Sequence, residues 1–332
     1  YLAVTDANLV LGRLQPQYFP SIFGPNEDQP VDVEGARKAF LELVSTEEGS
    51  KYTLEEIAYG FLQVANEAMC RPIRNLTQMK GYDITTHRLA CFGGAGGQHA
   101  CAIAKSLGMS KVFVHRYGGV LSAYGLSMAD AVYEEQEPAA DIYQYSDPSR
   151  ASEDPSAASR EERLSHLAEQ AIKNLIDQGY SQDSIIIEKY LNLRYEGTDT
   201  SVMIKEPEEL SGVLPYAEAF KEHYQREFGF DLEGRNLLID DYRVRAVVPG
   251  ENPVACKPVE KIGEPEPMDN QRVYFENGWE DANIYNIDDM KPGHEVVGPA
   301  VIIQSISTIV VEIGCTALVT SDGDLDITVA AQ

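Results

Sequence analysis

The chain has 332 residues, and its 53 acidic against 27 basic side chains give a formal net charge of −26 at pH 7. Binding to nucleic acid needs positive charge opposite the phosphates, so this balance argues against nucleic acid as a partner. The apolar runs are far shorter than the ~20 residues that cross a bilayer, which argues against a membrane span. A composition of 43% hydrophobic and 24% charged residues is typical of a globular chain, and the length predicts two or three domains.

The chain begins at Tyr1 without an initiator methionine or a leader segment, so we expect a fragment of a longer polypeptide. The cysteines are odd in number and scattered, with no CxxC pair and no histidine at zinc-binding spacing. They predict reduced thiols in a cytoplasmic protein and no metal site. Small apolar neighbours favour core packing over catalysis for Cys91 and Cys101. The five cysteines are Cys70, Cys91, Cys101, Cys256 and Cys315.

The first third of the chain predicts a long helix followed by a β-loop-α-β unit. Thr53 and Glu56 form a capping-box pattern ahead of an amphipathic stretch, which we expect Pro72 to kink or end. The parts expected for the unit are a strand at 88–92, a tight turn at 93–97, a helix at 98–107 and a strand at 111–115.

The remainder predicts three further regions. The acidic stretch 134–162 lacks periodicity, so we expect a mobile linker or loop there. Alternating helical and strand-like patterns then predict a second α/β unit, with helices at 164–176 and 216–228 and strands at 184–204 and 237–248. Short apolar runs separated by Gly, Pro and Asp predict a small C-terminal all-β domain. The expected domains are therefore 1–133, 134–162, 163–250 and 251–332.

A glycine-rich turn carries the strongest functional signal. Residues 91–100 read CFGGAGGQHA and place four glycines between a strand and a helix. Glycines let the backbone approach a ligand closely, and the N-terminus of a helix favours anions. The turn is not a Walker P-loop, and no acidic residue follows it at the dinucleotide spacing. Close packing of a helix on a strand also needs glycine, so spacing alone leaves ligand binding and packing equally open.

Four separated runs carry a family resemblance. They are VTDANLVLGRL at 4–14, CFGGAGGQHACA at 91–102, VFVHRYGGVLSAYGLSMAD at 112–130 and LRYEGTDT at 193–200. Together they resemble the hydantoinase/5-oxoprolinase family, with its ATP-dependent 5-oxoprolinase branch as the best match. N-methylhydantoinases and the ATP-binding subunits of acetone-type carboxylases are similar and remain alternatives.

The resemblance implies an actin-like ATPase fold, in which two ribonuclease-H-like lobes close over ATP and this chain supplies the second lobe. The glycine turn would be the adenosine-side loop, with His99 beside the nucleotide. The two Asp-Gly-Gly-Thr phosphate loops of the family are absent from this sequence. We expect them, and the Mg²⁺ of the full-length enzyme, upstream of Tyr1. The residues implied to bind the nucleotide are Gly93, Gly94, Ala95, Gly96, Gly97 and His99.

The implied reaction is ATP-driven hydrolysis of the lactam 5-oxo-L-proline to L-glutamate, a step of the glutathione cycle. An amide is a poor electrophile, and phosphorylating its oxygen would create a leaving group. The implied partners are the lactam and the missing N-terminal and C-terminal regions of the same polypeptide, and a homodimer stays open. We expect the isolated chain to be inactive. A non-catalytic nucleotide-binding or interaction module is the alternative from another class.

The catalytic residues stay unknown, and five side chains are candidates. His115 and Arg116 end a strand where open α/β sheets place ligands, and an anion contact there competes with a structural role. Asp6 and Asn8 either line the cleft or cap a helix. Arg194 precedes a Glu-Gly-Thr-Asp sequence, for which a surface turn is favoured over a substrate contact.

Overall fold

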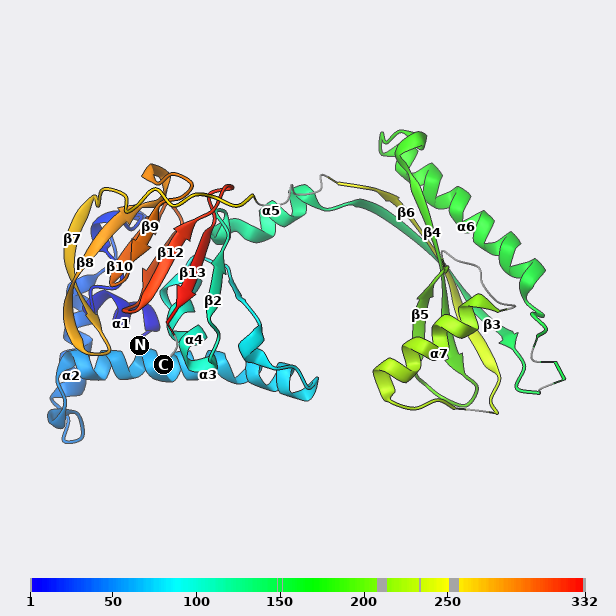
Figure 1. Ribbon diagram of the computed structural model, residues 1–332, viewed down its shortest axis with the longest axis horizontal. Coiled ribbons are helices and arrows are strands. Elements are labelled where there is room, and N and C mark those ends of the chain that lie inside the picture. Colours follow the sequence, from blue (N-terminus) through cyan, green and yellow to red (C-terminus); the bar gives the residue numbers. More distant parts are fainter. Residues whose placement is uncertain are drawn as a thin grey trace. The chain divides into compact units, whose positions relative to one another are not determined.

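A computed structural model gives the fold and describes residues 2–147, 149–150, 152–207, 214–232, 234–250 and 257–330 (Figure 1). The chain divides into two compact units. The first is Tyr1–Gly125 with Val254–Gln332, and the second is Leu126–Pro253. The first unit is therefore built from both ends of the chain, and the second is inserted between them.

Three helices near the N-terminus pack around a small apolar core of their own. They are α1 (Val4–Val10), α2 (Val33–Val44) and α3 (Leu54–Met79). The predicted capping box begins α3: the Glu56 amide donates to Thr53 Oγ1 at 3.2 Å, and the Thr53 amide donates to Glu56 Oε2 at 2.8 Å. The expectation that Pro72 could end this helix is wrong. Met69 and Ile73 pack on a buried core on either side of the proline, so burial keeps the chain helical.

The predicted β-loop-α-β unit is present in the first unit. Its strands β1 (Leu89–Cys91) and β2 (Lys111–Val114) are parallel neighbours, joined through the glycine turn and α4 (Ala100–Leu107). The other strands of this sheet come from the end of the chain, and the order is β1-β2-β13-β12-β9. They are β9 (Glu295–Val297), β12 (Cys315–Val319) and β13 (Leu325–Val329).

A second sheet of the first unit has the order β11-β10-β8-β7. Its strands are β7 (Asp269–Phe275), β8 (Gly278–Asn286), β10 (Ala300–Gln304) and β11 (Ser307–Val311). Helix α4 and strands of both sheets contribute to one buried apolar cluster. Cys101 and Cys315 belong to it, each 1% exposed. Core packing is thus confirmed for Cys101.

Short helical segments complete the described part of the first unit. They are η1 (Pro16–Tyr18), η2 (Gly49–Lys51), η3 (Ile84–Thr86), η4 (Gly96–Gln98), η5 (Gly118–Val120) and η7 (Ile287–Asp289), and α5 (Leu121–Met128) crosses the boundary between the units. Within the described ranges, no helix combines the length and the apolar character needed to cross a membrane.

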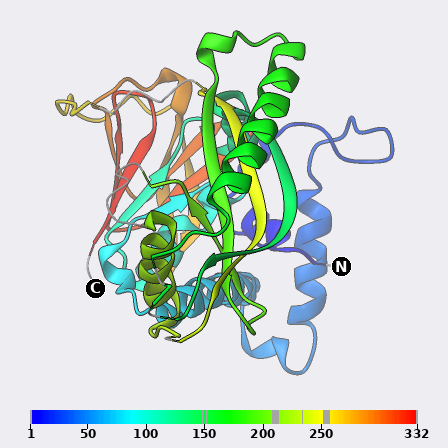
Figure 2. The same ribbon diagram turned by 90° about the vertical axis from the view of Figure 1, so that its right-hand side faces the viewer.

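The second unit is a four-stranded antiparallel sheet with the order β3-β6-β4-β5. Helices α6 and α7 share one apolar core with a single face of this sheet (Figure 2). The predicted elements at 164–176, 216–228 and 237–248 are confirmed. The bounds are β3 (Ala131–Gln144), α6 (Ala157–Asp177), η6 (Gln182–Ser184), β4 (Ile186–Tyr195), β5 (Ser201–Lys205), α7 (Pro215–Phe228) and β6 (Leu237–Val248).

The structure divides the chain differently from the expected domain boundaries. The stretch 134–162, expected to be a loop, contains most of β3 and the start of α6. Arginines offset the charge of several acidic side chains in β3. Glu134 lies 3.1 Å from Arg243 and 3.4 Å from Arg245 of β6. Arg163 of α6 lies 2.8 Å from Glu137 and 2.9 Å from Asp141. The region 251–332, expected to be an independent all-β domain, instead supplies strands to the sheet of β1 and β2.

Candidate functional site

The glycine turn follows β1 directly and leads into η4 and α4. The Gly93 amide donates to the Gly118 carbonyl at 2.7 Å, which ties the turn to the loop after β2. The Gly96 amide donates to the Gly93 carbonyl at 3.3 Å and closes the turn. The intervening amides, of Gly94 and Ala95, have no partner among the described residues. Two adjacent backbone donors are thus available to a ligand.

Packing explains part of the glycine content. A Cβ at Gly94 would lie 2.9 Å from the Ile306 carbonyl oxygen, and one at Gly96 would lie 2.8 Å from Cys91 Sγ. A Cβ at Gly97 would lie 2.8 Å from the Thr308 carbonyl oxygen. These three glycines let the turn pack closely on its neighbours. Gly93 has a φ of +91° with open space around it, so its backbone conformation is what favours glycine there.

A pocket of about 360 Å³ opens beside this turn, entirely within the first unit. The segment after η1 provides an apolar wall with Phe19 and Ile22, and the turn contributes Gly94 and Ala95 to the lining. Apolar side chains together with backbone donors suit a ligand with a flat apolar face and a hydrogen-bonding edge. The lining is Thr5, Leu14, Tyr18, Phe19, Pro20, Ile22, Gly94, Ala95, Gln98 and residues 304–308.

Gln98 supplies a directed side-chain donor to this pocket. It is 7% exposed, and its Oε1 accepts a hydrogen bond from Nδ2 of the buried Asn8 at 2.8 Å. The Nε2 group has no partner in the described part of the chain and belongs to a side chain that lines the pocket. Asn8 therefore orients Gln98, whereas Asp6 caps α1 by accepting the Ala3 amide at 2.7 Å.

His99, expected beside the nucleotide, turns toward α3 instead. Its Nδ1 lies 2.8 Å from Asn66 Oδ1, and it lines a separate apolar recess with Cys91 and Ile103. Burial, with a smaller effect from the Arg13 charge, lowers the pKa of His99 to about 4. The imidazole is neutral at pH 7 and has a structural hydrogen bond.

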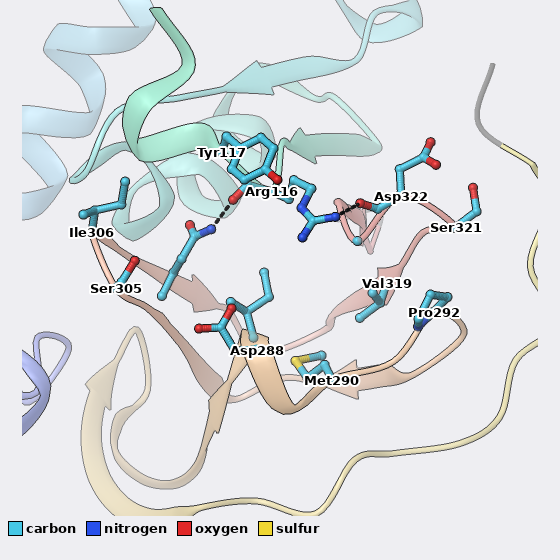
Figure 3. Close-up of a pocket in the computed structure, with 13 residues that line it drawn as sticks. Arg116, Tyr117, Asp288, Met290, Pro292, Ser305, Ile306, Val319, Ser321 and Asp322 are labelled. Carbon is cyan, nitrogen blue, oxygen red and sulfur yellow. Dashed lines mark hydrogen bonds between the residues drawn. The ribbon is translucent and has the colours of Figure 1, made fainter. Parts of the chain in front are cut away.

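His115 and Arg116 lie in the loop between β2 and η5. The Tyr117 amide donates to His115 Nδ1 at 3.0 Å, and the His115 ring stacks 4.8 Å from that of Tyr124. These contacts hold the His115 ring against its own loop and against α5. Arg116 lines a second pocket of about 350 Å³, drawn in Figure 3. Gln304, Ser305 and Ile306 line both this pocket and the one beside the glycine turn.

Arg194 belongs to the second unit, in the hairpin of β4 and β5. Its Nε donates to Asp240 at 2.7 Å and its Nη1 donates to the Thr198 carbonyl at 3.2 Å. Arg194 pairs with Ser201 across the hairpin, and Gly197 in the turn has a φ of +80°. The Glu-Gly-Thr-Asp sequence therefore forms a turn between β4 and β5, in which Glu196, Gly197 and Asp199 are exposed.

The sequence did not point to Gln98 or to the apolar wall of Phe19 and Ile22. Gln98 follows the last glycine directly, so the motif itself contained that signal. The wall lies in an irregular segment with no periodicity, and tertiary structure alone brings it to the turn.

Two solved structures have a fold similar to that of this chain. The structure matches nucleotide-free acetone carboxylase, from work on ATP-dependent acetone carboxylation, with a TM-score of 0.79 and 22% identity over 99% of this chain and 46% of that one. It matches an ATP-dependent caprolactamase from Pseudomonas jessenii with a TM-score of 0.70 and 22% identity, over 98% of this chain and 46% of that one.

Sequence comparison gives the family. The Hydantoinase/oxoprolinase profile matches residues 1–135, and the profile of the Hydantoinase/oxoprolinase C-terminal domain matches residues 149–322. A 5-oxoprolinase of Dictyostelium discoideum is 46% identical over 98% of this chain. The chain belongs to the hydantoinase/oxoprolinase family, and it spans 26% of the length of that relative.

Proposed function

We propose that this chain is the part of an ATP-dependent 5-oxoprolinase that holds the nucleoside of ATP. The observation that carries the proposal is the 46% identity to a 5-oxoprolinase over 98% of the chain. The full-length enzyme would open the lactam 5-oxo-L-proline to L-glutamate. The 24% identity to the beta subunit of acetone carboxylase from Xanthobacter autotrophicus is much lower, which favours a lactam over a ketone as substrate.

The pocket beside the glycine turn fits a nucleoside. A planar base can lie against the wall of Phe19 and Ile22, with Gln98 Nε2 donating to a ring nitrogen. The free amides of Gly94 and Ala95 can donate to ribose or phosphate oxygens. This placement supports the adenosine-side role of the turn and, with it, the second lobe of an actin-like ATPase.

The pocket residues bind and orient the nucleotide, and the apolar wall excludes water from one face of the base. ATP would supply the phosphoryl group that turns the amide oxygen into a leaving group. Within the described residues, no three or more His, Cys, Asp or Glu side chains are grouped to hold a metal ion. The Mg²⁺ ligands and phosphate loops would belong to other parts of the polypeptide, so we expect the isolated chain to lack turnover.

The proposed function predicts 5-oxoproline-dependent release of ADP by the full-length protein. Gln98→Ala should raise the KM for ATP about 3- to 10-fold, because one buried hydrogen bond to the base is lost. Gln78→Ala, at an exposed glutamine of α3, is the matched control. Thermal melts would separate loss of folding from loss of affinity.

Four outcomes would contradict the proposal or part of it. ADP release that needs a ketone and bicarbonate would favour the carboxylase alternative, and activity on a hydantoin alone would favour an N-methylhydantoinase. Nucleotide binding without turnover in the full-length protein would favour a non-catalytic module. An unchanged KM for ATP in folded Gln98→Ala would remove this pocket from the nucleotide site.

A further inference from the structure

The pocket in Figure 3 adjoins the proposed nucleoside pocket and has a distinct chemistry. Four chain segments build it: the loop after β2, η7, the turn between β10 and β11, and the turn between β12 and β13. Ser305 and Ile306 line both this pocket and the one beside the glycine turn. A ligand in this pocket would therefore be a close neighbour of a nucleotide bound beside Gly94.

Arg116 is held in place at the edge of this pocket by its backbone. Its amide donates to Oδ1 of the buried Asp324 at 2.8 Å, and its carbonyl accepts a hydrogen bond from Gln304 Nε2. The guanidinium lies 4.9 Å from the centre of the Tyr117 ring, and Nη1 donates to the Asp322 carbonyl at 3.1 Å. The two backbone hydrogen bonds therefore fix the position of Arg116 at the edge of the pocket.

The charge of Arg116 is not neutralised by the protein. Across the described ranges, no carboxylate lies within ion-pair distance of its guanidinium. A guanidinium carries five donors, and Arg116 uses one of them on a backbone carbonyl. The remaining donors suit the planar, two-oxygen geometry of a carboxylate.

The opposite side of the pocket offers an acceptor and an apolar floor. In Figure 3 the Asp288 carboxylate and the Arg116 guanidinium lie on opposite sides of the open space. Met290 and Val319 add apolar side chains to the lining of the pocket. A ligand that carries a carboxylate, an N–H donor and a few methylene groups would satisfy all three features.

We propose that this pocket recognises the anionic group of a small cyclic amide: Arg116 binds its carboxylate, and Asp288 accepts its lactam N–H. The inference rests on the proposed function, since 5-oxo-L-proline has all of these groups. The phosphates of ATP share the anionic chemistry, and they are the second source that the experiment must separate. Phosphates have no N–H to offer Asp288, whereas the lactam offers a group to each of the two side chains, so the carboxylate is favoured.

The test measures binding to the full-length protein by calorimetry. The probes are 5-oxo-L-proline, 2-pyrrolidinone, which is the same lactam without a carboxylate, N-acetylglycine, which is an open-chain amide with a carboxylate, and a non-hydrolysable ATP analogue. The variants are Arg116→Gln and Arg116→Lys. Arg272→Gln is the matched control, because Arg272 also stacks on an aromatic ring, 5.6 Å from that of Trp279, but lines neither pocket.

We expect Arg116→Gln to raise the Kd for 5-oxo-L-proline at least about tenfold, as for a lost charge-assisted hydrogen bond. Binding of 2-pyrrolidinone and of the ATP analogue should change less than about twofold, and Arg116→Lys should recover part of the loss. A loss confined to the ATP analogue would assign Arg116 to phosphate and overturn the carboxylate role. Unchanged binding of all probes to the folded variant would overturn the site itself.

Failure of the proposed function would look different. If the unmodified protein binds N-acetylglycine in an Arg116-dependent way and does not bind 5-oxo-L-proline, the pocket stands and the assigned lactam is wrong. If the unmodified protein binds none of the small carboxylates, both the carboxylate pocket and the proposed 5-oxoprolinase function are wrong.

Discussion

Arg13→Met is expected to lower the free energy of unfolding of the first unit by about 3–5 kcal/mol, the typical cost of removing one partner of a buried ion pair. Arg13 is 1% exposed and pairs with Glu312, which precedes β12. Its guanidinium lies 5.3 Å from the ring centre of Phe275 and 5.9 Å from that of Tyr59. The substitution would leave the Glu312 carboxylate buried without its cation. Urea unfolding followed by the fluorescence of Trp279, the single tryptophan, reports on this unit.

The stability lost in Arg13→Met, called the deficit below, should depend on pH in one direction. Burial raises the pKa of Glu312, and the Arg13 charge opposes that rise. Since the folded chain holds this proton more tightly than the unfolded chain, the contribution of Glu312 to stability falls as the pH rises from its ordinary pKa toward the raised one. Loss of Arg13 raises the folded pKa further, so the deficit should be smaller at about pH 5 than at about pH 7.5.

Two further variants make this prediction sharp. Arg37→Met, at an exposed arginine of α2, should change stability little. Adding Glu312→Leu to Arg13→Met should restore much of the lost stability, because no unpaired charge then stays buried. An equal deficit at both pH values, with no recovery in the double variant, would show that the aromatic contacts of Arg13 matter more than its charge.

Gly97→Ala is expected to cost about 1–3 kcal/mol of folding stability, as in other overpacked sites. The new Cβ would lie 2.8 Å from both the Thr308 carbonyl oxygen and Ile309 Cγ1, and 3.0 Å from Ile309 Cα. Two of these atoms are backbone atoms of β11, which cannot yield as a flexible side chain would. The turn and the strand would have to separate, and the pocket beside them would change shape.

Gly60→Ala is the matched control for this substitution. Gly60 lies within α3, and a Cβ there meets no atom within 4 Å. Alanine should therefore stabilise the helix by about 0.5–1 kcal/mol. Thermal or urea unfolding would compare the two variants. Equal stability of Gly97→Ala and the unmodified chain would mean that the contact between η4 and β11 is loose.

Local patterns predicted the local structure well. The capping box at Thr53 and Glu56 begins α3, and apolar periodicity located α6, α7 and β6. The prediction failed where tertiary contacts decide. Acidic composition indicated a loop where β3 lies, because the arginines that pair with Glu134 come from β6, far along the chain.

For the candidate site too, the sequence predicted the local pattern and did not predict the tertiary contacts. The four-glycine run identified the turn, because glycines between a strand and a helix are visible in the sequence. It did not show that Gly94 and Gly97 pack against neighbours, since Ile306 and Thr308 come from the other end of the chain. Likewise, a sequence alone does not show that Arg116 lacks a carboxylate partner, because ion pairing depends on distance in the folded chain.

The insertion of the second unit sets an order for folding during synthesis. A nascent chain that has reached Val248 contains every strand of the second unit's sheet. It has β1 and β2 of the first unit, but β13, which pairs with β2, ends at Val329. The second unit can therefore fold before synthesis of the chain is complete, whereas the first unit can fold only after its last strands have been made. Until β13 is made, the edge of β2 that it will cover can pair with strands of other chains. We expect chaperones to matter most at that stage.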